Sequence, residues 1–221
     1  RFVLADLDIR LGLPTQGLRV IAIEVDLDPL DLVRSGASSF GFAGFFASPE
    51  GRVVGGVGAA RRFSALGPDR LLAVDAPTRG IAPDVPLLVG FAFSEDGPSG
   101  LDWEGFGAAS VVVPEVTVIR EGGRSHLAMV IPPGSDGRSV LTLLSTLERP
   151  GPPGNAVDVE VAVATRPAPS DYVGLVDEAI GAIRAGSLSK VVLARSVLVR
   201  RSLPIDAFAL VAGLRDAHPS S

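Results

Sequence analysis

Short apolar segments separated by glycine and proline fill the first two-thirds of the chain and predict a β-rich structure. In residues 18–25 apolar side chains occupy nearly every position, which is typical of a strand covered on both faces. Residues 40–58 predict a hairpin, because an aromatic–glycine run and a valine–glycine run flank the turn Ser48-Pro49-Glu50-Gly51. Further strands are expected at 87–93, 109–113, 115–120 and 126–131, the last two joined by a turn at 121–124.

The last third of the chain changes to helices around one strand. Ser170 and Asp171 offer an N-cap, apolar residues then recur at helical spacing, and Gly186 fits the left-handed position that ends helices. A strand is expected at 190–199, followed by a helix at 204–217 with proline in its first turn. A short helix is also expected at 139–147, between two proline- and glycine-rich loops. These patterns predict an α/β (α+β) fold.

The composition excludes several classes of protein. The chain has no cysteine, which excludes disulfides, thiolate metal sites and cysteine nucleophiles. Its formal net charge is −5 and it has no basic run, so we expect no nucleic-acid binding. No apolar run reaches the roughly 18 residues of a membrane span, and no secretory signal is recognisable. We therefore expect a cytoplasmic protein without membrane contact. We also expect a monomer.

Lys190 is the single lysine of the chain, since 19 of the 20 basic residues are arginine. Where arginine supplies nearly every plain positive charge, a retained lysine suggests a task that arginine cannot perform. A desolvated lysine can be neutral near pH 7 and take a proton from water, whereas arginine stays charged. The alternative is a surface lysine at the start of a strand, with its ammonium in water. The arginine bias weakens that alternative and does not remove it.

The other candidate residues indicate no specific chemistry. Arg195 has the opposite strand parity to Lys190, so we expect it on the other side of the sheet, ion-paired or exposed. Residues 56–61 lack the third glycine and the helix of a dinucleotide-binding turn and predict a glycine-rich strand edge. His126 and His218 lack ligand-like spacing. The acidic clusters lack the pattern of a calcium loop and are expected to be solvated: Asp6, Asp8, Asp26, Asp28 and Asp31.

The segment Lys190-Val191-Val192-Leu193-Ala194-Arg195 follows a helix that ends in Ile183-Arg184-Ala185-Gly186. It resembles the corresponding segment of isochorismate synthases, within the wider family of chorismate-utilising enzymes. Upstream pieces match the N-terminal region of the bacterial enzymes in order and spacing, so the resemblance runs from about Phe40 onward. These pieces are residues 44–51, 56–60, 90–93, 103–106 and 113–114.

The resemblance implies layered antiparallel β-sheets with outer helices. Residues 1–221 would be the N-terminal part of a single chorismate-binding domain, with a β-rich portion at 1–165 and the lysine motif within 166–221. It also implies Mg²⁺-dependent conversion of the small-molecule substrate chorismate to isochorismate, with Lys190 as the general base that activates water to attack C2. Relatives that use ammonia carry glutamine at this position, so Lys190 favours water. A salicylate synthase, which goes on to lose pyruvate, or another chorismate-utilising enzyme stays open.

The resemblance stops short of the whole family pattern. The general-acid glutamate and the Mg²⁺-binding glutamates of the family lie in a C-terminal half, and no residue of this sequence matches their motifs. We therefore assign no metal-binding or cofactor-binding residue within 1–221 and expect the Mg²⁺ ligands C-terminal to it. We expect the 221 residues alone to be inactive; the non-enzyme alternative is a truncated fragment that binds chorismate or packs against a partner. Siderophore and menaquinone synthesis are both compatible with the sequence.

Overall fold

The structure is a computed structural model and describes residues 19–81, 85–98, 103, 105–131, 142 and 160–218. Its helices and strands are, in chain order, β1 (Arg19–Val25), α1 (Pro29–Gly36), β2 (Ala43–Ala47), β3 (Val53–Val57), β4 (Arg61–Ala65), α2 (Arg70–Thr78), β5 (Leu88–Phe91), β6 (Ala109–Val113), β7 (Val116–Glu121), β8 (Arg124–Ile131), β9 (Val161–Arg166), α4 (Pro169–Arg184), β10 (Ser196–Arg201) and α5 (Ala207–Ala217). The chain divides into unit 1, which combines Arg1–Pro152 with Val211–Ser221, and unit 2, Pro153–Leu210.

The strands described in unit 1 form two antiparallel sheets. The five-stranded sheet has the order β1-β8-β7-β3-β2, and the three-stranded sheet has the order β4-β6-β5. The direct pairing of β2 with β3 and of β7 with β8 confirms both predicted hairpins. Gly122 and Gly123 connect β7 to β8 with φ of 57° and 80°, the left-handed region that two-residue hairpin turns require.

Helix α1 covers one face of the five-stranded sheet. Gly55 on β3 makes this close approach possible, because a Cβ there would lie only 2.1 Å from the carbonyl oxygen of Pro29. The helix begins at this proline because Asp28 caps it, accepting a 2.8 Å hydrogen bond from Leu30 N, and proline is preset for the first helical position. Six strand residues that share the face of Gly55 by register are buried: Ile21, Val57, Val116, Val118, Leu127 and Met129.

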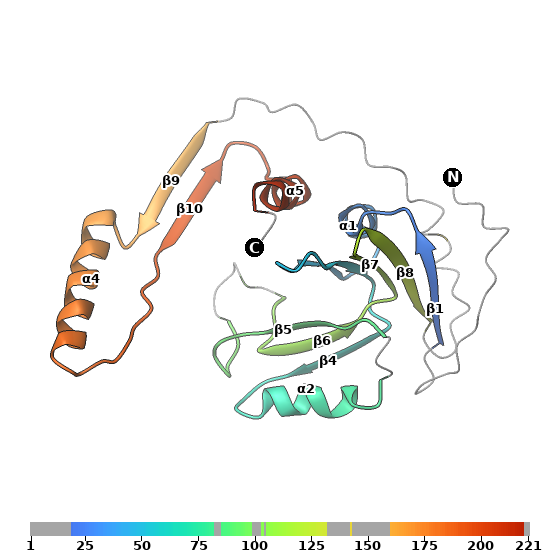
Figure 1. Ribbon diagram of the computed structural model, residues 1–221, viewed down its shortest axis with the longest axis horizontal. Helices are drawn as coiled ribbons and strands as arrows, with labels where there is room; N and C mark the ends of the chain where they lie inside the picture. Colours follow the sequence, from blue (N-terminus) through green and yellow to red (C-terminus); the bar gives the residue numbers. More distant parts are fainter. Residues whose placement is uncertain are drawn as a thin grey trace. The chain divides into compact units, whose positions relative to one another are not determined.

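The other face of the five-stranded sheet packs on the three-stranded sheet (Figure 1). A Cβ on Gly44 of β2 would lie 2.8 Å from Leu88 Cδ1 of β5, so the two sheets approach closely. Helix α2 covers the far side of the three-stranded sheet, where Val74 forms a core cluster with Ala109 and Val111. Unit 1 therefore stacks helix, sheet, sheet and helix. The expected α/β fold of layered antiparallel sheets with outer helices is confirmed.

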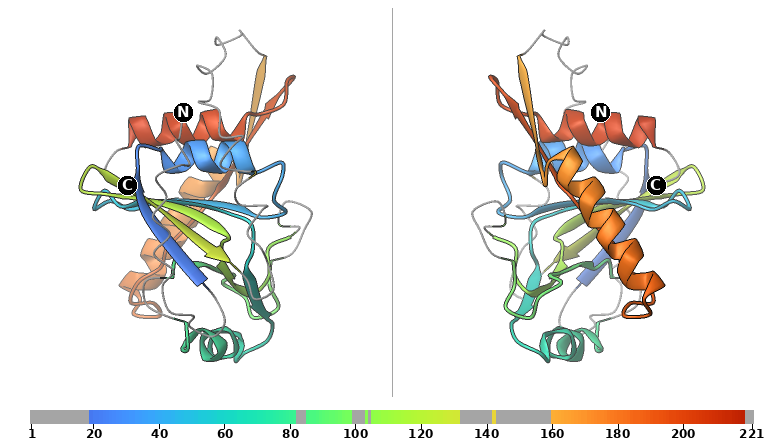
Figure 2. Two further views of the ribbon diagram at one scale, coloured as in Figure 1. Left: turned by 90° about the vertical axis from the view of Figure 1, so that its right-hand side faces the viewer. Right: turned by 90° about the vertical axis from the view of Figure 1, so that its left-hand side faces the viewer.

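Helix α5 begins at Ala207, so the predicted start at Pro204 is wrong. The reason is a cap by Asp206, whose Oδ1 accepts hydrogen bonds from Phe208 N at 2.9 Å and Ala209 N at 3.1 Å. From Val211 onward the helix belongs to unit 1, where it lies beside α1 (Figure 2).

Unit 2 contains α4 and the antiparallel pair β9–β10. Helix α4 is confirmed, but its predicted N-cap at Ser170 and Asp171 is wrong, because the helix begins at Pro169 after the N-cap residue Ala168. None of the residues described in this unit is buried. Its exposed apolar side chains include Val161, Val163, Leu175, Ile180, Ile183, Val197, Leu198 and Val199.

Some expectations concern residues outside the described ranges. The predicted helix at 139–147 is one of them, apart from Thr142, and the acidic residues Asp6 and Asp8 are others. Within the described ranges, no helix combines the length and the apolar character needed to cross a membrane.

Candidate functional site

Lys190 lies in the connection between α4 and β10, shortly after the glycine that ends the helix. Gly186 has a φ of 76°, which confirms its predicted left-handed conformation. Beyond it, Ser187 N donates to the carbonyl oxygen of Ala182 at 3.0 Å, which satisfies a carbonyl in the last turn of α4. This closure turns the chain out of the helix and into the segment that carries Lys190.

Residues 190–195, named here the lysine segment, form neither helix nor strand. The predicted strand at 190–199 is therefore wrong for its first six residues and correct from Ser196. The reason is the end of its partner: Arg166 of β9 pairs with Ser196, and Pro167 follows at once. Proline has no N–H to donate, and α4 begins at Pro169, so β9 offers no ladder hydrogen bonds to the lysine segment.

The lysine segment contacts the first turn of α4 through Tyr172. The Tyr172 hydroxyl donates to the carbonyl oxygen of Leu193 at 3.4 Å, a long hydrogen bond. The guanidinium carbon of Arg195 lies 5.8 Å from the centroid of the Tyr172 ring, within reach of a cation–π interaction. Arg195 was expected on the sheet, either ion-paired or exposed. It is exposed, but it belongs to no sheet. The sequence pattern assigned no role to Tyr172, because helical spacing alone does not distinguish it from the apolar residues of the same helix.

Lys190 itself is exposed and has no hydrogen bond or ion pair with another described residue. Across the described residues, no three or more His, Asp or Glu side chains gather where they could hold a metal ion. The described part of the chain therefore supplies a candidate base without a neighbouring acid, and it does not supply a magnesium ligand set.

The remaining sequence candidates are scattered over unit 1. His126 is exposed on β8, opposite Glu24 and Ile119, while His218 follows the end of α5. The glycine-rich residues 56–61 run from β3 into β4. They were predicted to lie at the edge of a sheet, which is wrong for β3 because this strand lies between β7 and β2. The glycines of β3 are buried because the sheet is covered closely on both faces.

The expectation that Asp28 is merely solvated is also wrong. Besides capping α1, it accepts a hydrogen bond from Arg120 Nη1 at 2.8 Å and from Arg215 Nη1 at 3.1 Å. Its side chain is only 18% exposed, so these ion pairs are partly shielded from water. The Asp28-Pro29 pair was a local signal for a helix start, since aspartate favours the N-cap and proline the first helical position.

Asp31, one turn into α1, is affected by the same cluster of charges. Burial raises the pKa of the Asp31 carboxyl above its ordinary value of 3.8, and the neighbouring Asp28 carboxylate raises it further. Three nearby guanidinium groups lower this pKa but do not cancel the increase: those of Arg34, Arg215 and Arg120.

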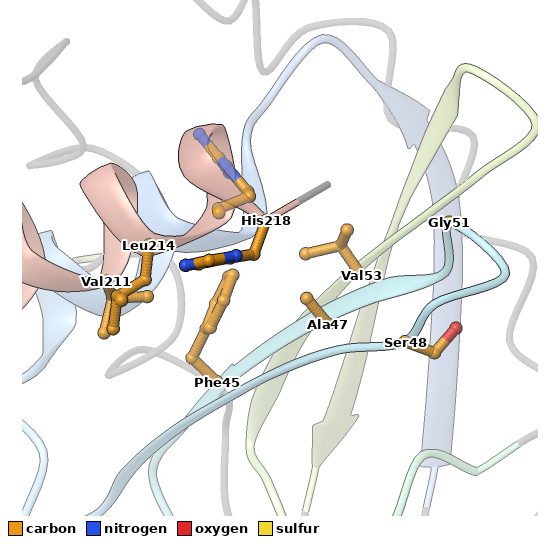
Figure 3. Close-up of a pocket in the computed structure, with 9 residues that line it drawn as sticks. Phe45, Ala47, Ser48, Gly51, Val53, Val211, Leu214 and His218 are labelled. Atoms are coloured by element: carbon orange, nitrogen blue, oxygen red, sulfur yellow. The ribbon is translucent and has the colours of Figure 1, made fainter. Parts of the chain in front are cut away.

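Two open pockets are found in unit 1, and Lys190 lines neither of them. One, of about 230 Å³, lies between α5 and the β2–β3 hairpin, where Phe45 and Val53 face Val211, Leu214 and His218 (Figure 3). Arg215 also lines this pocket, but its guanidinium is engaged by Asp28. The other pocket lies at the ends of β2 and β3, where the guanidinium carbon of Arg62 is 5.4 Å from the centroid of the Phe42 ring; its lining also includes Phe40, Gly58 and Glu115.

Comparison with known proteins gives three matches. Residues 14–221 match the family model described as chorismate binding enzyme. The salicylate biosynthesis isochorismate synthase of Pseudomonas aeruginosa is 33% identical over 143 residues, which cover 58% of this chain and 28% of that protein. The structure of MenF, the menaquinone-specific isochorismate synthase from Escherichia coli, matches with a TM-score of 0.65 at 21% identity. That match covers 90% of this chain and 45% of MenF, so the chain spans less than half the length of either relative.

Proposed function

Because the chain belongs to the family of chorismate-binding enzymes, we propose that it is part of an isochorismate synthase in which Lys190 is the general base. The similarity to two isochorismate synthases supports this choice within the family. The observation that carries the assignment is Lys190 itself: the single lysine among 20 basic residues stands first in the segment that resembles the isochorismate synthase motif.

The proposed reaction exchanges one hydroxyl position for another on the chorismate ring. Neutral Lys190 takes a proton from a water molecule as the water oxygen bonds to C2. Both ring double bonds shift, and the C4 hydroxyl leaves with an added proton as water. One water is consumed and one is released, so the product is an isomer of chorismate. A lysine can carry out this proton transfer because its amine can lose a proton, which a guanidinium does not do near neutral pH.

The described residues provide only one part of this chemistry. The departing hydroxyl needs an acid, and none lies beside Lys190 among them. The resemblance implies Mg²⁺, but no metal-ligand cluster forms within the described residues, so no step above is assigned to the metal. Lys190 is also exposed in the described structure, whereas an active site excludes bulk water from its reacting groups.

We therefore propose that the active enzyme contains further residues that cover unit 2 and shield Lys190. The exposed apolar side chains of α4, β9 and β10 support this, because folded proteins rarely leave so many such groups together in water without a partner. The share of the relatives that the chain covers, 45% and 28%, supports it as well. On this proposal, the 221 residues alone do not turn over chorismate.

The test is steady-state turnover of chorismate by the intact natural protein with Mg²⁺, comparing wild type with Lys190→Ala and Lys190→Arg. Both variants are expected to lose about 10²–10⁴-fold in kcat, because neither side chain can accept the proton. Lys190→Arg is the sharper variant, since it keeps the positive charge. Arg200→Ala, an exposed position on β10, is the control and should stay close to wild type. Near-normal turnover by Lys190→Arg would contradict the role of Lys190.

Product analysis separates the neighbouring activities. Isochorismate without pyruvate supports the proposal, whereas pyruvate together with salicylate identifies a salicylate synthase. The 221-residue chain, titrated separately with chorismate and Mg²⁺, should give no product. Isochorismate formed by that chain alone would show that no further residues are required.

A further inference from the structure

The connection between α4 and Lys190 depends on one aromatic side chain. Tyr172 is the single tyrosine of the chain and lies half-buried in the first turn of α4. It contacts the lysine segment at two positions two residues apart: the backbone carbonyl of Leu193 and the guanidinium of Arg195. A side chain that holds both a backbone atom and a side chain of one short segment restricts how that segment can rotate.

Burial along the lysine segment shows which side faces the helix. Leu193 is the one residue of 190–195 that is half-buried, while its neighbour Val192 is 92% exposed. Tyr172 therefore contacts the segment at its half-buried residue, Leu193, whereas Lys190, like Val192, is exposed.

We propose that Tyr172 is a positioning residue for Lys190; this rests on the proposed role of Lys190 as general base. Because β9 gives the lysine segment no ladder hydrogen bonds, the side that faces outward is set by side-chain contacts, and Tyr172 supplies two of them. Tyr172 does not touch the reacting atoms. It fixes the face of the segment from which the lysine amine is presented to water.

The two contacts of Tyr172 can be separated by substitution. Tyr172→Phe keeps the ring beneath Arg195 and removes the hydrogen bond to the Leu193 carbonyl, whereas Tyr172→Ala removes both. A displacement of about 1 Å of a reacting group costs on the order of 10²-fold in rate. We therefore expect kcat to fall roughly 10–100-fold in Tyr172→Ala, with KM for chorismate little changed. Tyr172→Phe should recover much of that loss, because the cation–π contact remains.

The experiment uses the intact natural protein and two measurements. The first is kcat and KM for chorismate in wild type, Tyr172→Phe, Tyr172→Ala and the control Val173→Ala. Val173 is the next residue on α4 and is 59% exposed, so its truncation tests for a general effect on the helix. The second is amide hydrogen exchange in peptides that cover residues 190–195, which reports the order of the lysine segment without reference to catalysis.

The proposal expects faster exchange at 190–195 and reduced kcat in Tyr172→Ala, partial recovery in Tyr172→Phe, and neither change in Val173→Ala. Unchanged exchange in Tyr172→Ala, or equal effects in Val173→Ala, would overturn it. Faster exchange with unchanged kcat would also overturn it, because Tyr172 would then order the segment without positioning the base. If the wild-type protein does not convert chorismate at all, the proposed function fails, and the exchange comparison alone decides whether Tyr172 holds the segment.

Discussion

Arg120 on β7 donates from Nη1 to Asp28 Oδ2 over 2.8 Å, joining residues that are 92 positions apart in the sequence. The same carboxylate caps α1 and accepts from Arg215 of α5, so three elements of unit 1 meet at one side chain. Arg120 is held in turn by Ser125, whose Oγ accepts from Nε at 3.1 Å. Because the carboxylate is only 18% exposed, its loss would leave two partly buried guanidinium groups without their counterion.

Asp28→Ala is expected to lower the free energy of unfolding by about 2–3 kcal/mol, combining a lost N-cap with two broken, partly shielded ion pairs. The measurement is urea unfolding of the intact protein. Asp75→Ala is the matched control, since it breaks the exposed pair with Arg79 on α2 and should cost less than about 0.5 kcal/mol. Similar losses in the two variants would show that Asp28 does no more than an ordinary surface carboxylate.

Asp31→Asn is expected to stabilise the protein at pH 7. The pKa of Asp31 is raised in the folded state, so its charged form is disfavoured by folding. The penalty is absent below the ordinary pKa of 3.8, where the carboxyl is protonated in both states, and it develops as pH rises through the folded-state value. The gain in melting temperature from Asp31→Asn should therefore shrink as pH is lowered from 7 toward about 4 and be absent below that. An equal gain at pH 3 and pH 7 would refute this account.

Gly55→Ala is expected to destabilise unit 1 by about 3 kcal/mol or more, because the new methyl group meets backbone that cannot rotate away. The added Cβ would lie 2.1 Å from the carbonyl oxygen of Pro29, so α1 has to move off the sheet. Gly41→Ala, where no atom lies within 4 Å of the added carbon, should change stability by less than about 0.5 kcal/mol. Thermal unfolding of both variants distinguishes the tight site from the open one.

Thr117→Val is expected to stabilise the protein by about 1 kcal/mol, because it removes a buried polar atom without changing side-chain shape. Thr117 on β7 is fully buried, and its hydroxyl has no hydrogen-bond partner among the described residues. Ser125→Ala is the comparison. It should lower the free energy of unfolding, because the buried Ser125 hydroxyl accepts a hydrogen bond from Arg120. Destabilisation by Thr117→Val, measured in urea, would show that this hydroxyl has a partner after all.

Local patterns predicted the β7–β8 turn and the end of α4, whereas α1, β4, α2 and β9 lie in segments for which no helix or strand was predicted. The β7–β8 hairpin followed from Gly122 and Gly123, and the end of α4 followed from Gly186, because positive φ is a property of glycine itself. The layered sheets came from the resemblance rather than from periodicity. The start of α5 was misplaced because Pro204 was preferred to Asp206 as a helix signal.

The missed features depend on partners far away in the sequence. Strand propensity favoured residues 190–195 as a strand, but β9 ends at Arg166 and leaves them unpaired. Asp28 could be read locally as a cap, whereas its contacts with Arg120 and Arg215 span 92 and 187 residues and follow only from the packing of β7 and α5. Lys190 was identified from sequence, and its exposure agrees with the stated alternative of a surface lysine, although the residue does not begin a strand.

Unit 1 takes residues from both sides of unit 2, and this has a consequence for synthesis on the ribosome. The chain emerges from its N-terminal end, so the ion pair between Asp28 and Arg120 can form once both sheets are outside the exit tunnel. Arg215, 187 residues beyond Asp28, becomes accessible only after all of unit 2 has been translated. The second ion pair of Asp28 is therefore formed late, and a ribosome that stalls within unit 2 would hold unit 1 without the α5 contact.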